Sequence, residues 1–274
     1  MPNTGKRTLT RIDASTGRAV ATITLPDQPF AVQAVEDTVW VTVFPFGGPP
    51  PNKGSLVRIN PSTNRIVATI PAGGAPYAIA VEQNNVWVAS AATNQLFRID
   101  AGTNKVVAAI PVAEGPEGVA VGVGRVWVAS RGAGSLSEID PSTNKVVSKS
   151  IITGGPRSVA FGFGTVWVAS VNGAVTRYDP TTLGAIADVL IENPGVSGLV
   201  LDDESAWAVS DGVGFLYRID PKSNTVVQSI DMTRTPHSTD VEGVAVEEGF
   251  VWVVNASDKT LLKIGPGAPS PTPL

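Results

Sequence analysis

Short apolar segments alternate with polar turns along almost the whole chain. In residues 116–151, for example, the segments PEGVAV, VWVAS, SLSEID and NKVVSKSI follow one another with only a few turn residues between them. Short runs bounded by Gly, Pro, Asn and Asp are typical of β-strands, and no stretch has the apolar spacing of a helix. The pattern predicts an all-β protein built from four-stranded units.

A tryptophan marks the second strand of each unit. All the tryptophans of the chain lie in VWV-like segments, at Trp40, Trp87, Trp127, Trp167, Trp207 and Trp252. A four-stranded repeat of about forty residues is typical of β-propeller blades. We interpret the tryptophans as packing between neighbouring blades, because large aromatic side chains dominate such cores.

The connection between the third and fourth strands is nearly the same in every copy, as in IDPSTNK at residues 139–145. Its Asp can accept hydrogen bonds from nearby backbone N–H groups, Pro presets φ, and Asn tolerates the left-handed conformation. The motif is therefore interpreted as a structural hairpin. A calcium loop is disfavoured because each copy offers a single carboxylate.

The number of strands predicts the number of blades. The N-terminal region supplies two strands, five complete repeats supply four each, and the C-terminal region supplies three. This is one strand more than six blades need and three fewer than seven need. We therefore predict one six-bladed propeller domain over residues 1–264, whose last blade is closed by an N-terminal strand, with seven blades as the lesser alternative. Residues 265–274 are predicted to be a flexible Pro-rich tail.

The repeat resembles that of a known family. The motif RIDPxTNKVVATIP with the VWVAS segment is similar to the repeat of the YVTN/YncE-like β-propellers, over residues 8–264. The PYAIAV and VWVAS segments are also similar to the streptogramin (virginiamycin B) lyase propellers. The resemblance implies a propeller that could be a lyase, a ligand-binding protein or a scaffold. Those lyases use two histidines, a glutamate and a divalent metal, whereas this chain has one histidine, His237.

The copies differ most at one position, ten residues before each tryptophan. The following position is always small and the next always apolar, so only this ring is chemically diverse. Its members are Phe30, Tyr77, Glu117, Arg157, Ser197 and Glu242. In a six-bladed ring, Glu117 and Glu242 would face each other across the mouth of the central channel, with Arg157 and an aromatic arc of Phe30 and Tyr77 beside them. This mouth lies on the face that carries the loops between strands two and three and the loops between blades, which we call the top face. The alternative is a hydrated mouth where polar residues are simply tolerated.

Two insertions lie next to this ring. Residues 44–54 and 231–240 lengthen the repeats, and the second insertion contains His237 and Asp240. Long loops in compact folds are often functional, so both are candidates for a rim over the mouth, although drift at a permissive edge is the alternative. His237 is the candidate general base, although a surface role is the alternative.

Composition excludes several classes of function. Lys and Arg number 20 against 24 Asp and Glu, which disfavours nucleic acid or an anionic membrane as the partner. Cysteine is absent, which excludes disulfides and thiolate chemistry. No apolar run approaches a membrane span. We expect a soluble monomer, cytoplasmic as the sequence stands or exported if a signal peptide has been removed.

Together these patterns favour a non-enzymatic binding or scaffold module, whose partner is a small polar molecule or a peptide at the top face. The expected ligand-binding residues are the six of the ring together with Asp240. The alternative is a lyase or hydrolase that uses His237 with Glu117 and Glu242, where a divalent cation could bind. A second alternative is a designed or consensus-like repeat protein without a ligand.

Overall fold

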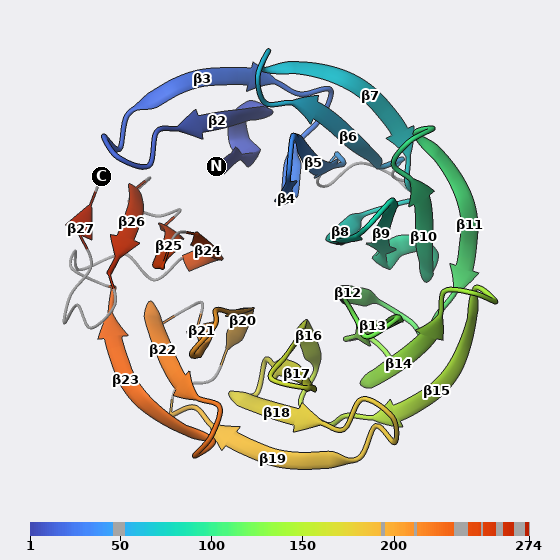
Figure 1. Cartoon of the computed structure of the whole chain (residues 1–274), viewed down its shortest axis with the longest axis vertical. Helices are drawn as coiled ribbons and strands as arrows, with labels where there is room; N and C mark the ends of the chain where they lie inside the picture. Colours follow the sequence, from blue (N-terminus) through green and yellow to red (C-terminus); the bar gives the residue numbers. More distant parts are fainter. Residues whose placement is uncertain are drawn as a thin grey trace. The chain divides into compact units, whose positions relative to one another are not determined.

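The computed structural model describes residues 1–45, 53–192, 195–210, 213–232, 241–247, 249–255, 260–265 and 272–273. Within them the strands form seven sheets, so the fold is an all-β, seven-bladed β-propeller (Figure 1). The chain divides into two compact units: unit 1 is residues 1–133 with 137–149, and unit 2 is residues 134–136 with 150–274.

The blades take their strands in chain order. Blades 1 and 2 consist of β1 (Pro2–Asn3), β2 (Thr8–Ile12) and β3 (Ala19–Thr24), then β4 (Pro29–Val35), β5 (Thr38–Val43), β6 (Ser55–Asn60) and β7 (Arg65–Pro71). Blades 3 and 4 consist of β8 (Pro76–Glu82), β9 (Asn85–Ser90), β10 (Gln95–Asp100) and β11 (Lys105–Pro111), then β12 (Pro116–Gly122), β13 (Arg125–Ser130), β14 (Ser135–Asp140) and β15 (Lys145–Ile151).

The last three blades follow the same order. Blade 5 consists of β16 (Pro156–Gly162), β17 (Thr165–Ser170), β18 (Ala174–Tyr178) and β19 (Ala185–Leu190). Blade 6 consists of β20 (Val196–Leu201), β21 (Ala206–Ser210), β22 (Phe215–Asp220) and β23 (Thr225–Asp231). Blade 7 consists of β24 (Val241–Glu247), β25 (Phe250–Asn255), β26 (Thr260–Ile264) and β27 (Thr272–Pro273).

Helices are limited to two single turns, η1 (Thr4–Lys6) and η2 (Ala91–Thr93), in the described part of the chain. None of the helices found there could cross a membrane. In each unit the first strand of a blade lies on the inner side and the fourth on the outer side (Figure 1).

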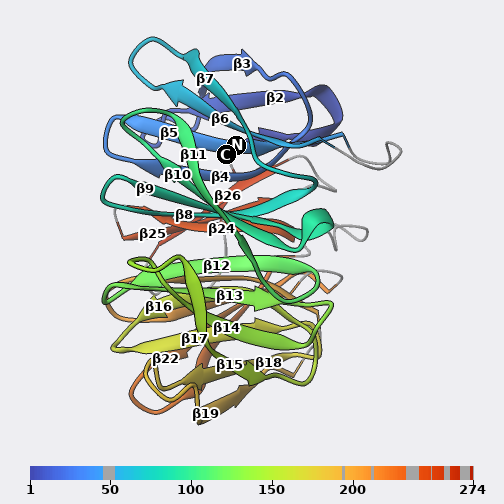
Figure 2. The ribbon, with the colours of Figure 1, turned by 90° about the vertical axis from the view of Figure 1, so that its right-hand side faces the viewer.

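The up-and-down strand order gives each blade two different ends; β2 and β3 of blade 1 correspond to the third and fourth strands of the four-stranded blades. The connections between strands one and two and between strands three and four lie at one end, which we call the turn end. The connections between strands two and three, and from strand four to the next blade, lie at the other end, which we call the loop end. Strands β8, β9 and β10 show this arrangement in the side view (Figure 2).

The predicted six blades closed by an N-terminal strand are wrong. All the strands expected from the sequence form, but β3 pairs with its hairpin partner β2, in the register Thr8↔Thr24. The edge of β26 is instead paired with β27, in the register Leu262↔Pro273. Strand β1 adds to β2 and makes blade 1 a separate three-stranded sheet. The physical reason is that the β2–β3 hairpin is a local contact, which closure of the last blade by β3 alone would have broken.

Trp40, Trp87, Trp167 and Trp207 pack between blades, as predicted. The tryptophans of blades 2 to 6 are 0–3% exposed. Trp87 of blade 3 belongs to a cluster with Val126, Val128 and Ile139 of blade 4. Trp207 of blade 6 clusters in the same way with Val251 and Val253 of blade 7. Each such ring buries a large apolar area, so these contacts stabilise the stack of sheets within each unit.

An arginine on the third strand links each of several blades to the next; we call this the arginine clasp. The guanidinium of Arg98 lies 5.3 Å from the ring centre of Trp87. Its Nη1 donates to the carbonyl oxygen of Pro141 at 2.6 Å and to Oδ1 of Asn144 at 3.0 Å. Arg58 and Arg177 make the equivalent bonds to the turns of blades 3 and 6. The Asn of the repeated turn accepts a hydrogen bond from this arginine, which is one reason why the turn is similar between copies.

Blade 4 departs from the clasp. Its third strand has Glu138 where blades 2, 3, 5 and 6 have Arg, and this carboxylate is buried at 6% exposure. Oε1 of Glu138 lies 2.8 Å from Nε of Arg125 on β13. In the turn of blade 5, Leu183 occupies the position of the clasp Asn and keeps its left-handed backbone, with φ 53°. Both residue types of the clasp are therefore replaced at this one step along the chain.

The fourth strands carry a β-bulge close to the turn end, which we call the outer bulge. In β11, for example, Ile99 pairs with Val106 and Arg98 with Ala108, which leaves Val107 as the extra residue. The extra residues for which the register is described are Val20, Val67, Val107, Ile186 and Val227. They are 53–57% exposed. A bulge bends an edge strand and hinders its pairing with other chains, so this feature protects the edges of the sheets.

Candidate functional site

The first strand of each four-stranded blade also carries a β-bulge, at the loop end; we call it the inner bulge. In β12, Pro116 pairs with Ser130 and Gly118 with Ala129, which leaves Glu117 as the extra residue. The same shift leaves Tyr77, Arg157, Ser197 and Glu242 as extra residues, and in β4 it spans Phe30 and Ala31. The six diverse positions of the sequence are thus one structural feature, the inner bulge.

A bulge explains why these positions can vary. Two residues of the bulged strand face one on its partner, so the extra side chain is re-aimed and is not fixed by the regular alternation of the strand. The residues that follow return to regular pairing, for example Gly118 with Ala129 and Val119 with Val128. Their side chains are held by cross-strand neighbours, which accounts for the small and apolar residues found there in every copy.

An aromatic cluster occupies the inner bulges of blades 2 and 3. The rings of Phe30 and Tyr77 meet edge to face, with centroids 4.5 Å apart. Phe44, which follows β5, lies 5.8 Å from Phe30 and 5.6 Å from Tyr77 and is 3% exposed. A Cβ on Gly54 would collide with Pro76, so glycine lets this loop approach the start of β8. The sequence placed Phe30 and Tyr77 in one arc but did not place Phe44 in it.

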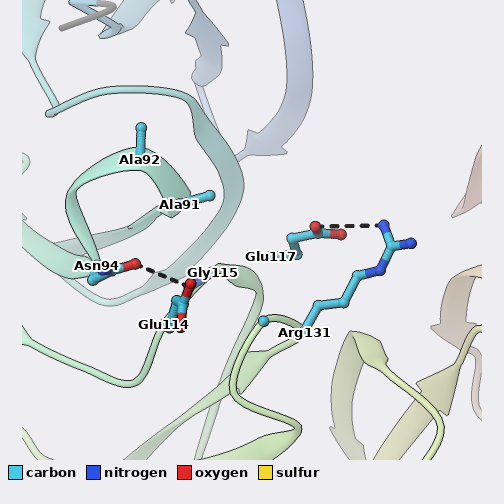
Figure 3. A pocket seen from close by; sticks show the side chains of 8 residues that line it. Ala91, Ala92, Asn94, Glu114, Gly115, Glu117 and Arg131 are labelled. Carbon is cyan, nitrogen blue, oxygen red and sulfur yellow. Dashed lines mark hydrogen bonds and ion pairs between the residues drawn. The ribbon is translucent and has the colours of Figure 1, made fainter. Parts of the chain in front are cut away.

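A pocket of about 510 Å³ lies at the loop end of blades 3 and 4 (Figure 3). It is lined by Ala91, Ala92 and Asn94 after β9, by Glu114, Gly115 and Glu117 around the start of β12, and by Arg131 and Gly132 after β13. Nη1 of Arg131 lies 3.6 Å from Oε1 of Glu117. The Arg131 side chain is 47% exposed and the Glu117 side chain 17%. The pocket therefore presents both signs of charge.

The floor of this pocket is held by short backbone contacts. The amide of Arg131 donates to the carbonyl oxygen of Gly115, and that of Ala133 to the carbonyl oxygen of Glu114, both at 2.9 Å. Oδ1 of Asn94 in blade 3 accepts from the amide of Gly115 at 2.9 Å. Gly115 has φ +63°, and a Cβ there would lie 2.9 Å from the amide nitrogen of Gly132. The two loops of blade 4 are thus fixed against each other, which positions Glu117 beside Arg131.

Arg131, like Phe44, was not predicted from the sequence. It follows VWVAS directly, and that position also varies between copies, as Phe44, Ala91, Arg131 and Val171. The diverse ring lies ten residues before each tryptophan, in the first strand. The varied position that holds Phe44 and Arg131 lies after the tryptophan, in the loop that follows the second strand.

Arg157 and Ser197 are not among the residues that line this pocket. Both belong to unit 2, and the Oγ of Ser197 is buried with no hydrogen-bond partner in the described residues. The backbone of Glu242 lies in β24, but His237 and Asp240 fall outside the described residues. The expected facing of Glu117 and Glu242 rested on six blades. The structure has seven sheets, an odd number, so the pairing of opposite blades on which this expectation depended does not apply.

The divalent cation considered for Glu117 and Glu242 stays a prediction. In the part of the chain that the structure describes, no group of three or more His, Asp or Glu side chains is arranged to hold a metal ion.

The Asp residues of the turn end are bound within their own turns. Oδ1 of Asp13 accepts from Oγ of Ser15 at 2.7 Å, from the amide of Thr16 at 2.8 Å and from its hydroxyl at 2.9 Å. These bonds stabilise the carboxylate and lower the pKa of Asp13 from 3.8 to about 2. Hydrogen bonds within the turn lower the pKa of Asp100, Asp140, Asp179 and Asp220 in the same way. The turns are structural, as the sequence indicated.

Comparison with known proteins supports the fold. A computationally designed protein, Ika8, is 14% identical, with a TM-score of 0.74, over 97% of this chain and 80% of the designed chain. Hydrazine synthase of Kuenenia stuttgartiensis is 15% identical, with a TM-score of 0.59, over 70% of this chain. The match spans 66% of that chain, just under two thirds of its length.

No protein-family model and no curated protein matches the sequence. At such low identity the likeness to solved structures shows the fold alone. The chain is a β-propeller repeat protein. The β-propeller part of the predicted resemblance is therefore confirmed, and its narrower family stays a prediction.

Proposed function

We propose that this chain is a non-catalytic binding module that holds a small polar ligand at the loop end of blades 3 and 4. The observation that carries the proposal is the ion pair of Glu117 and Arg131 inside a pocket of about 510 Å³. Pockets of a few hundred Å³ with a small number of placed polar groups are typical of small-molecule sites.

The way in which the two charges are held supports the proposal. Glu117 is an inner-bulge residue, and Arg131 stands on a loop whose backbone is bonded to Gly115. Groups that the backbone fixes in advance lose little entropy when a ligand binds. Phe30 and Tyr77, which pack on the buried Phe44, lie at the neighbouring inner bulges of the same unit, and both are partly exposed, so they offer an apolar surface to a larger ligand or a peptide.

We also propose that the chain is a YVTN/YncE-like propeller that acts as a monomer, and that it is a binding module and not a lyase. The acid–base residue that catalysis would need, His237, lies outside the described residues, so the proposal is not extended to a reaction.

The test is ligand binding by thermal shift over a library of small polar metabolites, with calorimetry of each hit. We expect Glu117→Gln and Arg131→Gln each to weaken the hits while leaving the melting temperature of the free protein unchanged. The matched control is Glu204→Gln, which removes the exposed pair of Glu204 with Arg218 at 3.3 Å in blade 6. Hits that bind both pocket variants as tightly as the parent would overturn the proposed site.

A further inference from the structure

The charges in the pocket point to the class of the ligand. Oε1 of Glu117 and Nη1 of Arg131 are 3.6 Å apart, beyond the 2.7–2.9 Å of a charge-assisted hydrogen bond. With the Arg131 side chain 47% exposed, the guanidinium has room to turn toward a ligand. A partly exposed pair of this kind adds little stability, so little is lost when a ligand takes over both charges.

We infer, on the basis of the proposed function, that the pocket binds a small zwitterion with the charge spacing of an α-amino acid. Its ammonium group lies on Glu117 and its carboxylate on Arg131. Because the two protein charges are adjacent, the two ligand charges must also be adjacent, as they are when one carbon separates them. A ligand whose charges are several carbons apart reaches only one partner.

The rest of the lining sets the order of importance of the two ligand charges. Glu114 adds a second carboxylate to the pocket, whereas Arg131 is the one cationic side chain among its lining residues. The excess of negative charge favours the ammonium end of the ligand over its carboxylate. Ala91 and Ala92 form the opposite side of the pocket and leave room for a small side chain (Figure 3).

The experiment compares four probes by isothermal titration calorimetry at low salt. L-alanine carries both charges, ethylammonium lacks the carboxylate, propionate lacks the ammonium, and 6-aminohexanoate separates the two charges. We expect L-alanine to bind most tightly and ethylammonium and 6-aminohexanoate to bind at least about tenfold more weakly, because the first lacks the carboxylate and the second reaches only one partner. Propionate, which lacks the ammonium, is expected to bind most weakly.

Variants of the pocket test which residue binds the ammonium of the ligand and which binds its carboxylate. Glu117→Gln is expected to weaken L-alanine and ethylammonium but not propionate, and Arg131→Gln to weaken L-alanine and propionate but not ethylammonium. Glu204→Gln in blade 6 serves as the control and is expected to leave all four probes unchanged. Melting followed by tryptophan fluorescence confirms that each variant is folded.

Two results would overturn the inference. If ethylammonium or 6-aminohexanoate bound as tightly as L-alanine, Glu117 and Arg131 would not be binding adjacent ammonium and carboxylate groups of one ligand. Failure of all four probes, while another small molecule binds and is weakened by Glu117→Gln, would reject the zwitterion but leave the proposed function standing. Small-molecule binding that neither pocket variant alters would reject the proposed function itself.

Discussion

The inner and outer bulges are the same local feature, an extra residue in a strand, on opposite edges of a blade. The types of residue found at the two bulges differ. The extra residue of the outer bulge is Val in blades 1, 2, 3 and 6 and Ile in blade 5. At the inner bulge the extra residue is aromatic, acidic, basic or a small alcohol, as in Tyr77, Glu117, Arg157 and Ser197.

We propose that the difference separates positions that serve stability from positions that serve ligand recognition. At the outer edge a β-branched residue suits an extended, half-exposed strand, and the same problem, an unpaired edge, recurs in every blade. The first strand is also a sheet edge, but its bulge residue differs from blade to blade, so each blade can carry different chemistry there. A position that is uniform between copies therefore reports stability, and one that varies reports a candidate for recognition.

The largest expected effect is at a uniform buried position. Trp87→Ala should lower the free energy of unfolding by about 3–5 kcal/mol, because it leaves a cavity between blades 3 and 4. Chemical denaturation followed by circular dichroism measures this change. Glu117→Gln, at the inner bulge, is the contrasting variant and should change stability by less than about 0.5 kcal/mol. Equal losses in the two variants would remove the distinction between uniform and varied positions.

The arginine clasp should give the next largest effect. Arg98→Gln removes two hydrogen bonds to the turn of blade 4 and the contact with Trp87, so we expect a loss of about 1.5–3 kcal/mol. Arg131→Gln, an arginine of the varied class, is the control and should be close to neutral in the same denaturation experiment. A neutral Arg98→Gln would mean that the clasp does not contribute to stability.

A smaller effect is expected when the same residue, Thr, is placed at an outer and at an inner bulge. Val107→Thr keeps a β-branched side chain at the outer bulge, which is 54% exposed, and should change stability by less than about 0.5 kcal/mol without affecting any ligand. Tyr77→Thr at the inner bulge removes a ring from the aromatic cluster and should weaken ligands that have an apolar part. Calorimetry on both variants checks this, and weaker binding in Val107→Thr would contradict the assignment of the outer bulge to structure alone.

The smallest effect is confined to low pH. The folded pKa of Asp13 is about 2, below its ordinary value of 3.8, so its contribution to stability is present above pH 4 and is lost as the pH falls through 2. Asp13→Asn keeps the acceptor oxygen but cannot titrate, and it should flatten this part of the acid-unfolding curve. Blade 2 already has an Asn at the equivalent position: Oδ1 of Asn60 accepts hydrogen bonds from the amide and hydroxyl of Ser62. An unchanged acid transition would show that Asp13 is equally ionised in the unfolded chain.

Part of the candidate site was predictable from the sequence. Counting back from each tryptophan located the inner bulges, and the arc of Phe30 with Tyr77 is a real contact. Phe44 and Arg131 were not found, because their roles come from a loop folding back onto the first strand of the same or the next blade. No periodic pattern in the sequence encodes such a contact between a loop and a strand.

The sequence by itself determined the strands, their hairpins and the tryptophan core, since alternation, turn chemistry and a repeat of about forty residues are all local properties of the chain. Only the tertiary structure decided the number of blades. That number depends on β1 and β27, strands of two residues that each include a proline. A strand so short leaves no alternation to read, and it forms because a neighbouring edge is there to pair with it.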